Sequence, residues 1–300
     1  EGLSRGGPLS NALYRSGGSL YFSKNFLPSL HASLGGYTTS MGNLCSSAGN
    51  RGLQNCFGQV PVQPLNVLRQ KGKSLLFWGR NVLENYLSLV PLAKELRDRG
   101  GSMGVLEIRS TPTVSWCDYR WILAPGGDCF LAAWLCRRLL KEKRVFPEWK
   151  SGVCNPEAFT AFLETLREEE LLRRSGMCEE QALDLYEWLL ESAPVTHYLG
   201  YGMQRYCHGE LQAWWVGALA VLLGGFQVPG SAVVFGKDEM ARFPDSLLID
   251  PPSRRSFPEG RFWRSLKQVS PPVHTLAIFC GNPVKQAPDG HAIAETIRGI

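Results

Sequence analysis

The stretch "SLLFWGRNVLENYLSLVPLAKELRDRGGSMGVLEIR", residues 74–109, decides the fold of this chain. It opens with a short apolar run that ends at Gly79 and continues with apolar residues at helical spacing over 81–101. Pro91 predicts a kink in that helix. A second apolar run follows over 103–109. Strand, helix and strand in this order are the repeating unit of an α/β fold with a parallel sheet.

The same alternation continues along the chain. "RWILAPGGD" (120–128) predicts a further strand, and "CFLAAWLCRRLLKEKR" (129–144) predicts a helix with its basic residues at the favourable C-terminal end. "THYLGYG" (196–202) returns to strand, and an apolar helix begins at about Glu210. We therefore expect a Rossmann-like parallel sheet with helices on both faces.

A helical insertion interrupts this alternation at about 155–192. Its first part, 155–174, has Asn155 as a candidate N-cap and Pro156 at the first helical position. Its second part, 179–192, has the spacing of another helix.

A change in composition predicts two α/β domains. Residues 227–272 are rich in proline, serine and charge, and one more strand follows at 274–281. We expect 1–44 and 237–300 to form a first, discontinuous and incomplete α/β domain. Residues 45–236 are expected to form the larger, dinucleotide-binding domain.

Composition and charge limit the classes of function. The 300 residues are 44% hydrophobic and 20% charged, enough for one large or two moderate globular domains. The 32 basic and 27 acidic residues are interspersed, and no stripe of aromatic and basic residues accompanies the net charge of +5. We therefore expect no nucleic-acid partner.

Cysteines and apolar runs give further limits. The nine cysteines include no CxxC pair and no Cys/His cluster at zinc or iron–sulfur spacing, which favours reduced thiols and a cytoplasmic location. The longest apolar run, 211–226, is shorter than the roughly 20 residues that cross a bilayer, so we expect no transmembrane segment. The start "EGLSRGG" lacks an initiator methionine, and we expect a piece of a longer protein.

Three predicted strands end in loops that suit a nucleotide: "WGRN" (78–81), "EIRST" (107–111) and "PGGD" (125–128). Open α/β sheets bind ligands at the carboxyl ends of their strands. Gly79 would let the backbone approach a phosphate, Arg109 could pair with it, and an acidic residue at the end of the second strand could accept hydrogen bonds from a ribose or a base.

Simpler interpretations of these loops stay open. Glycines make ordinary turns, and Asp128 could only cap the helix that follows it. "GYGMQR" (200–205) has Arg205 where a dinucleotide fingerprint needs its third glycine, so a plain nicotinamide enzyme is not supported.

Cys45 stands in "GNLCSSAGNRGLQNCFG", residues 42–58, among glycine, serine and asparagine. Most cysteines of this kind are inert buried thiols that behave as small apolar residues. A functional thiolate is the alternative.

Five segments together carry a family resemblance. They are "CSSAG" at Cys45, "LLFWGRN", "LEIRSTPTVSWCDYRWILAPGGD", "LGYGMQRYCHG" and "FCGNPVKQAPD". In this order and at this spacing they resemble the catalytic subunits of the molybdopterin oxidoreductase superfamily. The resemblance covers the central two α/β domains of such a subunit, without its N-terminal iron–sulfur domain and its C-terminal cofactor-binding domain.

The resemblance implies a bis-molybdopterin guanine dinucleotide cofactor carrying molybdenum or tungsten. Cys45 falls where the family places the protein ligand to the metal, and a soft thiolate suits that role. Ile108 departs from the proline of the family's usual Asp-Pro-Arg-x-Thr segment. The residues that the resemblance assigns to cofactor binding are Trp78, Gly79, Asn81, Glu84, Glu107, Arg109, Thr111, Gly126, Gly127, Asp128, Tyr201, Gln204, Arg205 and Asn282.

The resemblance also implies an activity and partners. The expected function is two-electron oxygen-atom or hydride transfer between a small-molecule substrate and an electron chain, with an electron-transfer iron–sulfur subunit as partner and an iron–sulfur cluster in the missing N-terminal region. An upstream twin-arginine signal would instead place the protein in the periplasm. One alternative is a non-catalytic relative without the metal cofactor, like the large iron–sulfur subunit of NADH dehydrogenase. The retention of Cys45, Asn81, Arg109 and Asp128 together favours the enzyme.

Overall fold

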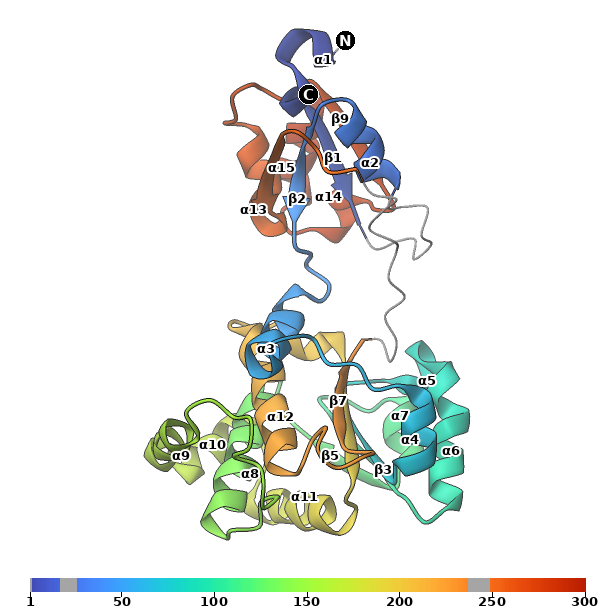
Figure 1. Ribbon diagram of the computed structural model, residues 1–300, viewed down its shortest axis with the longest axis vertical. Coiled ribbons are helices and arrows are strands. Elements are labelled where there is room, and N and C mark those ends of the chain that lie inside the picture. The colour runs from blue at the N-terminus through green and yellow to red at the C-terminus, as the bar shows by residue number, and fades with distance from the viewer. Residues whose placement is uncertain (1, 17–25, 237–248) are drawn as a thin grey trace. The chain divides into compact units, whose positions relative to one another are not determined.

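The chain divides into two compact units in a computed structural model that describes residues 2–16, 26–236 and 249–300 (Figure 1). The first unit is Glu1–Ser47 with Ala241–Ile300, and the second is Ala48–Met240. The sequence placed the domain boundaries after 44 and after 236. The second of these, and the part of the proline-rich stretch over 237–248, lie outside the described residues.

A five-stranded parallel sheet forms the centre of the second unit, with the order β5-β4-β3-β6-β7. Its strands are β3 (Ser74–Trp78), β4 (Met103–Glu107), β5 (Tyr119–Ile122), β6 (Val195–Leu199) and β7 (Ala232–Phe235). The continuous apolar runs of β3 and β4 follow from burial on both faces, because a strand covered on one face only would alternate apolar and polar residues.

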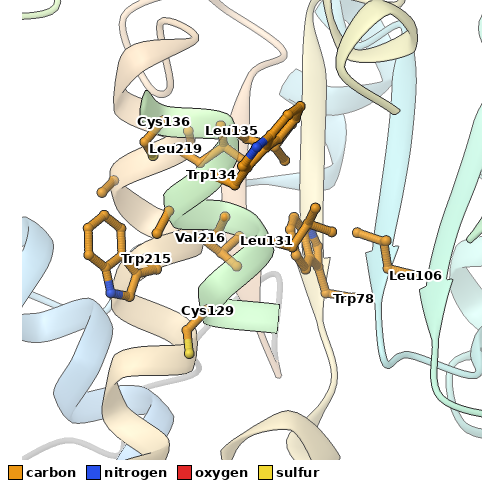
Figure 2. Close-up of a cluster of buried hydrophobic side chains, with 14 of the residues drawn as sticks. Trp78, Leu106, Cys129, Leu131, Trp134, Leu135, Cys136, Trp215, Val216 and Leu219 are labelled. Atoms are coloured by element: carbon orange, nitrogen blue, oxygen red, sulfur yellow. The ribbon is translucent and has the colours of Figure 1, made fainter. Parts of the chain in front are cut away.

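Helices cover both faces of this sheet. Leu76 and Trp78 face a core shared with α8 (Asp128–Lys141), α11 (Glu179–Glu191) and α12 (Gly209–Leu222), as Figure 2 shows for α8 and α12. On the opposite face, Leu75 and Phe77 pack against α4 (Leu65–Lys71), α6 (Val90–Asp98) and α7 (Pro112–Trp116). The predicted α/β class, with helices on both faces of a Rossmann-like sheet, is confirmed.

Two predicted helices are each divided. The expected helix over 81–101 is α5 (Val82–Asn85), a 3₁₀ turn (Leu87–Leu89) and α6. Pro91 lies in the first turn of α6, where its missing N–H would have no partner in any case, and so makes no kink in the helix interior. The chain breaks earlier, at Tyr86, whose φ of −149° is extended.

The insertion contains the second divided helix. Residues 155–174 form α9 (Pro156–Thr165) and α10 (Glu168–Ser175), because Leu166 between them is extended and packs on the core. Asn155 occupies the N-cap position in a left-handed conformation, but its side chain accepts no capping hydrogen bond.

The first unit has its own parallel sheet, with the order β8-β2-β1-β9. Its strands are β1 (Asn11–Arg15), β2 (Tyr37–Met41), β8 (Arg254–Pro258) and β9 (Thr275–Phe279). The helices α13 (Glu259–Leu266) and α15 (Gly290–Arg298) cover one face, and α2 (Phe26–Ser33) covers the other. The predicted strand at 274–281 therefore pairs with β1 and not with the sheet that holds β3.

Candidate functional site

The carboxyl edge of the five-stranded sheet has the geometry of a ligand site. The chain runs outward from β3 to β4 and β5 and then returns to β6 on the other side of β3, which makes a topological switch point between β3 and β6. At this point a Cβ on Gly200 would lie 1.9 Å from the Gly79 carbonyl oxygen. Gly79 itself has a φ of +55° and open space where a Cβ would be. The backbone at Gly200 therefore lies directly against the backbone at Gly79, and only glycine fits at position 200.

The loops after β3, β4 and β5 meet at this edge, because these three parallel strands are neighbours. Arg109 is exposed, and within the described ranges it forms no hydrogen bond or ion pair. Thr111 instead serves the fold, since its Oγ1 accepts a hydrogen bond from the Val114 N–H at 3.3 Å and caps α7.

Other predicted residues of the β3 loop are bound within the protein. The Asn81 Nδ2 donates to the exposed Glu84 carboxylate at 2.6 Å, and the Asn81 Oδ1 accepts from the Thr113 hydroxyl at 2.7 Å. The Trp78 indole is fully buried and donates to His197 Nδ1 at 3.1 Å. Any ligand contact of Trp78 would therefore come from its backbone.

Asp128 is the most unusual residue of this edge. It begins α8, yet only 4% of it is exposed, and Glu107 at the end of β4 is 8% exposed. The pKa of the Asp128 carboxyl is raised to about 7, mainly by burial; its own backbone N–H opposes this shift, and the nearby Glu107 charge adds to it. The backbone N–H only partly offsets the cost of burying the ionised carboxyl.

The glycine turn before Asp128 is held from another helix. The Gln212 Nε2 donates to the Gly126 carbonyl at 3.1 Å, and the Gln212 Oε1 accepts from the Cys129 N–H at 2.9 Å. A Cβ on Gly127 would lie 2.5 Å from the Ser175 carbonyl oxygen. Sequence analysis missed Gln212, although a lone glutamine in the apolar run 211–226 was a visible signal.

The loop after β6 completes the edge. The Tyr201 ring packs against Phe235 with centroids 4.9 Å apart, and Gln204 Oε1 accepts from the Gly49 N–H at 2.5 Å in the first turn of α3 (Ser47–Phe57). Arg205 is exposed. Tyr206, which sequence analysis did not select, lies with its ring 3.2 Å from where a Gly126 Cβ would be.

Cys45 lies in the first unit, on an exposed turn after β2. The Asn43 Oδ1 accepts from the Ser46 N–H at 2.6 Å, and the Asn43 N–H donates to the Ser47 hydroxyl at 2.7 Å. The Glu259 carboxylate accepts from the Leu44 N–H at 3.0 Å. The turn that carries Cys45 is therefore held from both sides of the thiol.

Asn282 follows β9 in the same unit. Its Oδ1 accepts from the Lys285 N–H at 3.3 Å and caps α14 (Pro283–Gln286), while its own N–H donates to Gln286 Oε1 at 2.7 Å. Asn282 is therefore an exposed residue whose side chain begins a short helix.

Three general findings complete the site. All nine cysteines are thiols. Within residues 2–16, 26–236 and 249–300, no three His, Cys, Asp or Glu side chains gather as a metal cluster. In the same ranges no helix combines the length and the apolar character that a membrane crossing requires.

Comparisons with known proteins give relatives but no family. No family model matches the chain. It is 24% identical over 276 residues to the probable oxidoreductase YyaE of Bacillus subtilis, covering 89% of this chain and 40% of the relative. It is 23% identical over 269 residues to the probable oxidoreductase YoaE of the same organism, covering 84% and 38%. The chain thus spans about two fifths of the length of these relatives.

A solved structure shares the fold. Acetylene hydratase from Pelobacter acetylenicus matches with a TM-score of 0.59 and 18% identity over 76% of this chain and 31% of that one. A hydratase adds water, whereas the two Bacillus subtilis relatives are named for redox chemistry. The likeness to the hydratase therefore shows the fold and not the reaction.

Proposed function

We propose that this chain is the central part of a molybdenum- or tungsten-dependent oxidoreductase and binds the guanine dinucleotide end of its molybdopterin cofactor. The buried Asp128 carboxyl at the carboxyl edge of the sheet is the observation that carries the proposal. The similarity to two probable oxidoreductases along most of the chain supports the redox class.

The residues of the edge fit a guanine nucleotide. A guanine base presents neighbouring N–H donors on one edge, and such donors would stabilise a buried carboxylate. Asp128 would accept from the base, with Glu107 beside it. Gly79 leaves room for a phosphate close to the backbone, and Arg109 offers a guanidinium that no protein carboxylate neutralises within the described ranges.

Cys45 is the proposed protein ligand to the metal. Its exposed place on a hydrogen-bonded turn suits a thiol that must present its sulfur to a metal ion. Bound there, the cofactor would supply the two-electron chemistry, while the chain positions it and admits a small-molecule substrate. Tyr201, Gln204, Arg205 and Asn282 remain candidate cofactor contacts that would need to exchange or extend their present contacts.

Metal and nucleotide content test the proposal. The protein at its natural length is purified from cells supplied with molybdate or tungstate, and its metal is measured by mass spectrometry. We expect molybdenum or tungsten, and GMP released by acid hydrolysis. Cys45→Ala should lose turnover with little change in stability, while Cys154→Ala, another exposed thiol, should resemble wild type.

The contrary results are distinct. Wild-type protein without metal and without GMP contradicts the proposal and favours the non-catalytic relative. Wild-type turnover in Cys45→Ala removes the ligand role of Cys45 alone.

A further inference from the structure

Tyr206 has a ring and a hydroxyl that the fold does not use. The residue is partly exposed, and in the described part of the chain it makes no hydrogen bond and no aromatic stack. Its ring lies against the Gly126 backbone, 3.2 Å from where a Cβ on that residue would be. A tyrosine that only stabilises a fold normally buries its ring and pairs its hydroxyl.

The loop that carries Tyr206 is tightly built. Gln204, two residues earlier, bonds to the Gly49 N–H. His208, two residues later, is left-handed with a φ of +56°, and a Cβ on Gly209 would lie 2.0 Å from the Gln204 carbonyl oxygen. The short segment between β6 and α12 thus presents the ring from a fixed backbone.

The ring also lies beside the buried acids. Desolvation raises the pKa of the Tyr206 phenol, and the charges of Asp128 and Glu107 raise it further. Gly126, which the ring contacts, is two residues before Asp128. A planar molecule whose N–H edge reaches Asp128 would therefore pass next to the Tyr206 ring.

We propose that Tyr206 is the stacking residue of this site and packs against the face of the purine base whose N–H edge Asp128 accepts. This inference rests on the proposed function and adds a residue to it. Stacking supplies affinity for any base, while the carboxylate selects guanine, because adenine places a ring-nitrogen lone pair where guanine has an N–H.

Binding of GMP to cofactor-free protein tests the role of the ring. The protein is produced in cells that cannot make molybdopterin, and the Kd for GMP and for AMP is measured by calorimetry at a pH above 7. We expect GMP to bind at least about tenfold more tightly than AMP. Tyr206→Phe keeps the ring and should bind GMP like wild type. Tyr206→Leu removes it and should weaken GMP binding about tenfold.

Each result decides between the two proposals. If wild-type protein binds no GMP, the guanine site and the stacking role are both wrong. If wild type binds GMP and Tyr206→Leu binds it equally well, only the stacking role is wrong. Equal weakening by Phe and Leu would assign the effect to the hydroxyl and would also overturn stacking. Urea unfolding of each variant verifies that the fold is kept.

Discussion

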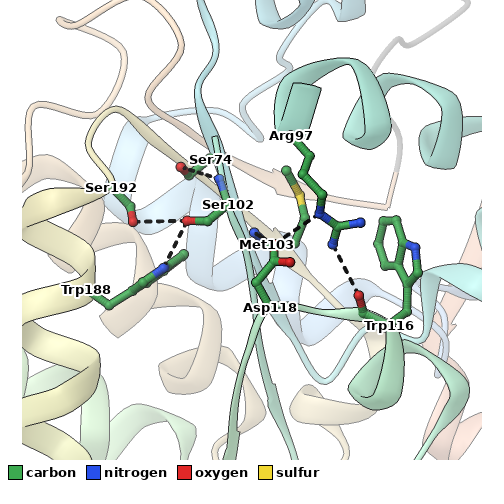
Figure 3. Close-up of polar contacts among 8 residues, drawn as sticks. All are labelled: Ser74, Arg97, Ser102, Met103, Trp116, Asp118, Trp188 and Ser192. Carbon is green, nitrogen blue, oxygen red and sulfur yellow. Dashed lines mark hydrogen bonds and ion pairs between the residues drawn. The ribbon is translucent and has the colours of Figure 1, made fainter. Parts of the chain in front are cut away.

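The two edges of the five-stranded sheet treat their polar groups in opposite ways. At the amino edge, shown in Figure 3, the Ser102 N–H donates to the Ser74 hydroxyl at 3.1 Å, and the Ser102 hydroxyl bonds to Ser192 at 3.1 Å. The Trp188 indole N–H also donates to the Ser102 hydroxyl, at 3.0 Å. These contacts join the starts of β3 and β4 to the end of α11.

A second group at the amino edge is equally complete. The Asp118 carboxylate accepts from the Met103 N–H at 2.8 Å and from Arg97 Nε at 3.2 Å. Arg97 also donates to the Trp116 carbonyl at 3.1 Å and lies over the Trp116 ring (Figure 3). Every charge in this group has a partner inside the protein.

At the carboxyl edge the charged groups have fewer protein partners, although Glu107 accepts from the Ile108 N–H at 2.9 Å. Asp128 is buried with a raised pKa, while Arg109 is exposed and, in the described ranges, forms no ion pair. A buried acid whose charge is only partly compensated costs stability. We infer that the amino edge stabilises the sheet, whereas the carboxyl edge, with buried Asp128 and exposed Arg109, can receive a ligand.

The largest expected effect is on binding at the carboxyl edge. Asp128→Asn replaces two carboxylate acceptors by one amide oxygen and an N–H that faces the donors of the base. We expect the Kd of cofactor-free protein for GMP to rise about 100-fold, because charge-assisted hydrogen bonds to the base are lost. Asp118→Asn at the amino edge is the matched control and should bind GMP like wild type. Equal weakening by both variants would break the distinction between the edges.

The same two substitutions should change stability in opposite directions. The difference between the ordinary pKa of 3.8 and the folded pKa of about 7 limits the cost of ionising buried Asp128 to about 4 kcal/mol. At a pH above 7, Asp128→Asn should therefore raise the free energy of unfolding by about 2 kcal/mol. Asp118→Asn weakens the Arg97 pair and should lose about 1 kcal/mol. Urea unfolding of both variants measures these signs, and destabilisation by Asp128→Asn would show that Asp128 is satisfied within the fold.

More of the fold than of the candidate site could be predicted from the sequence. The strand–helix alternation is a local signal, so the buried strands and the glycines that end them could be predicted from residues 74–109. The breaks at Tyr86 and Leu166 could not, because tertiary packing overrode helical spacing there.

The site residues that were not predicted are defined by contacts between distant parts of the chain. Gln212 is 86 residues from Gly126, whose carbonyl it binds, and the ring of Tyr206 reaches the same glycine. The burial of Asp128 likewise depends on residues packed around it, which no motif states. The motif identified Asp128 as an acidic site residue, but it did not indicate that the pKa of the carboxyl is raised.

The pH dependence of stability should isolate Asp128. Its folded pKa lies above the ordinary value, so between pH about 4 and about 7 the unfolded chain has lost this proton while the folded chain keeps it. The stability that the protonated Asp128 carboxyl gives the wild-type protein is therefore present at low pH and is lost as the pH rises through about 7. We expect the difference in unfolding free energy between Asp128→Asn and wild type to grow across this window and to stay constant above it. A difference that does not change with pH would contradict the raised pKa.

The smallest expected effect concerns Arg109. Its exposed guanidinium is screened by water and salt, so a contact with a phosphate is worth less than the buried contacts of Asp128. Arg109→Gln should raise the Kd for GMP about threefold at low salt and less at high salt, while guanosine, which has no phosphate, should bind the variant and wild type equally. Arg120→Gln, on β5 away from the loop ends, is the control and should change neither ligand. If Arg109→Gln weakens the binding of guanosine and of GMP equally, Arg109 acts on the base or on the loop. The phosphate contact would then have to be assigned to the backbone at Gly79 and not to Arg109.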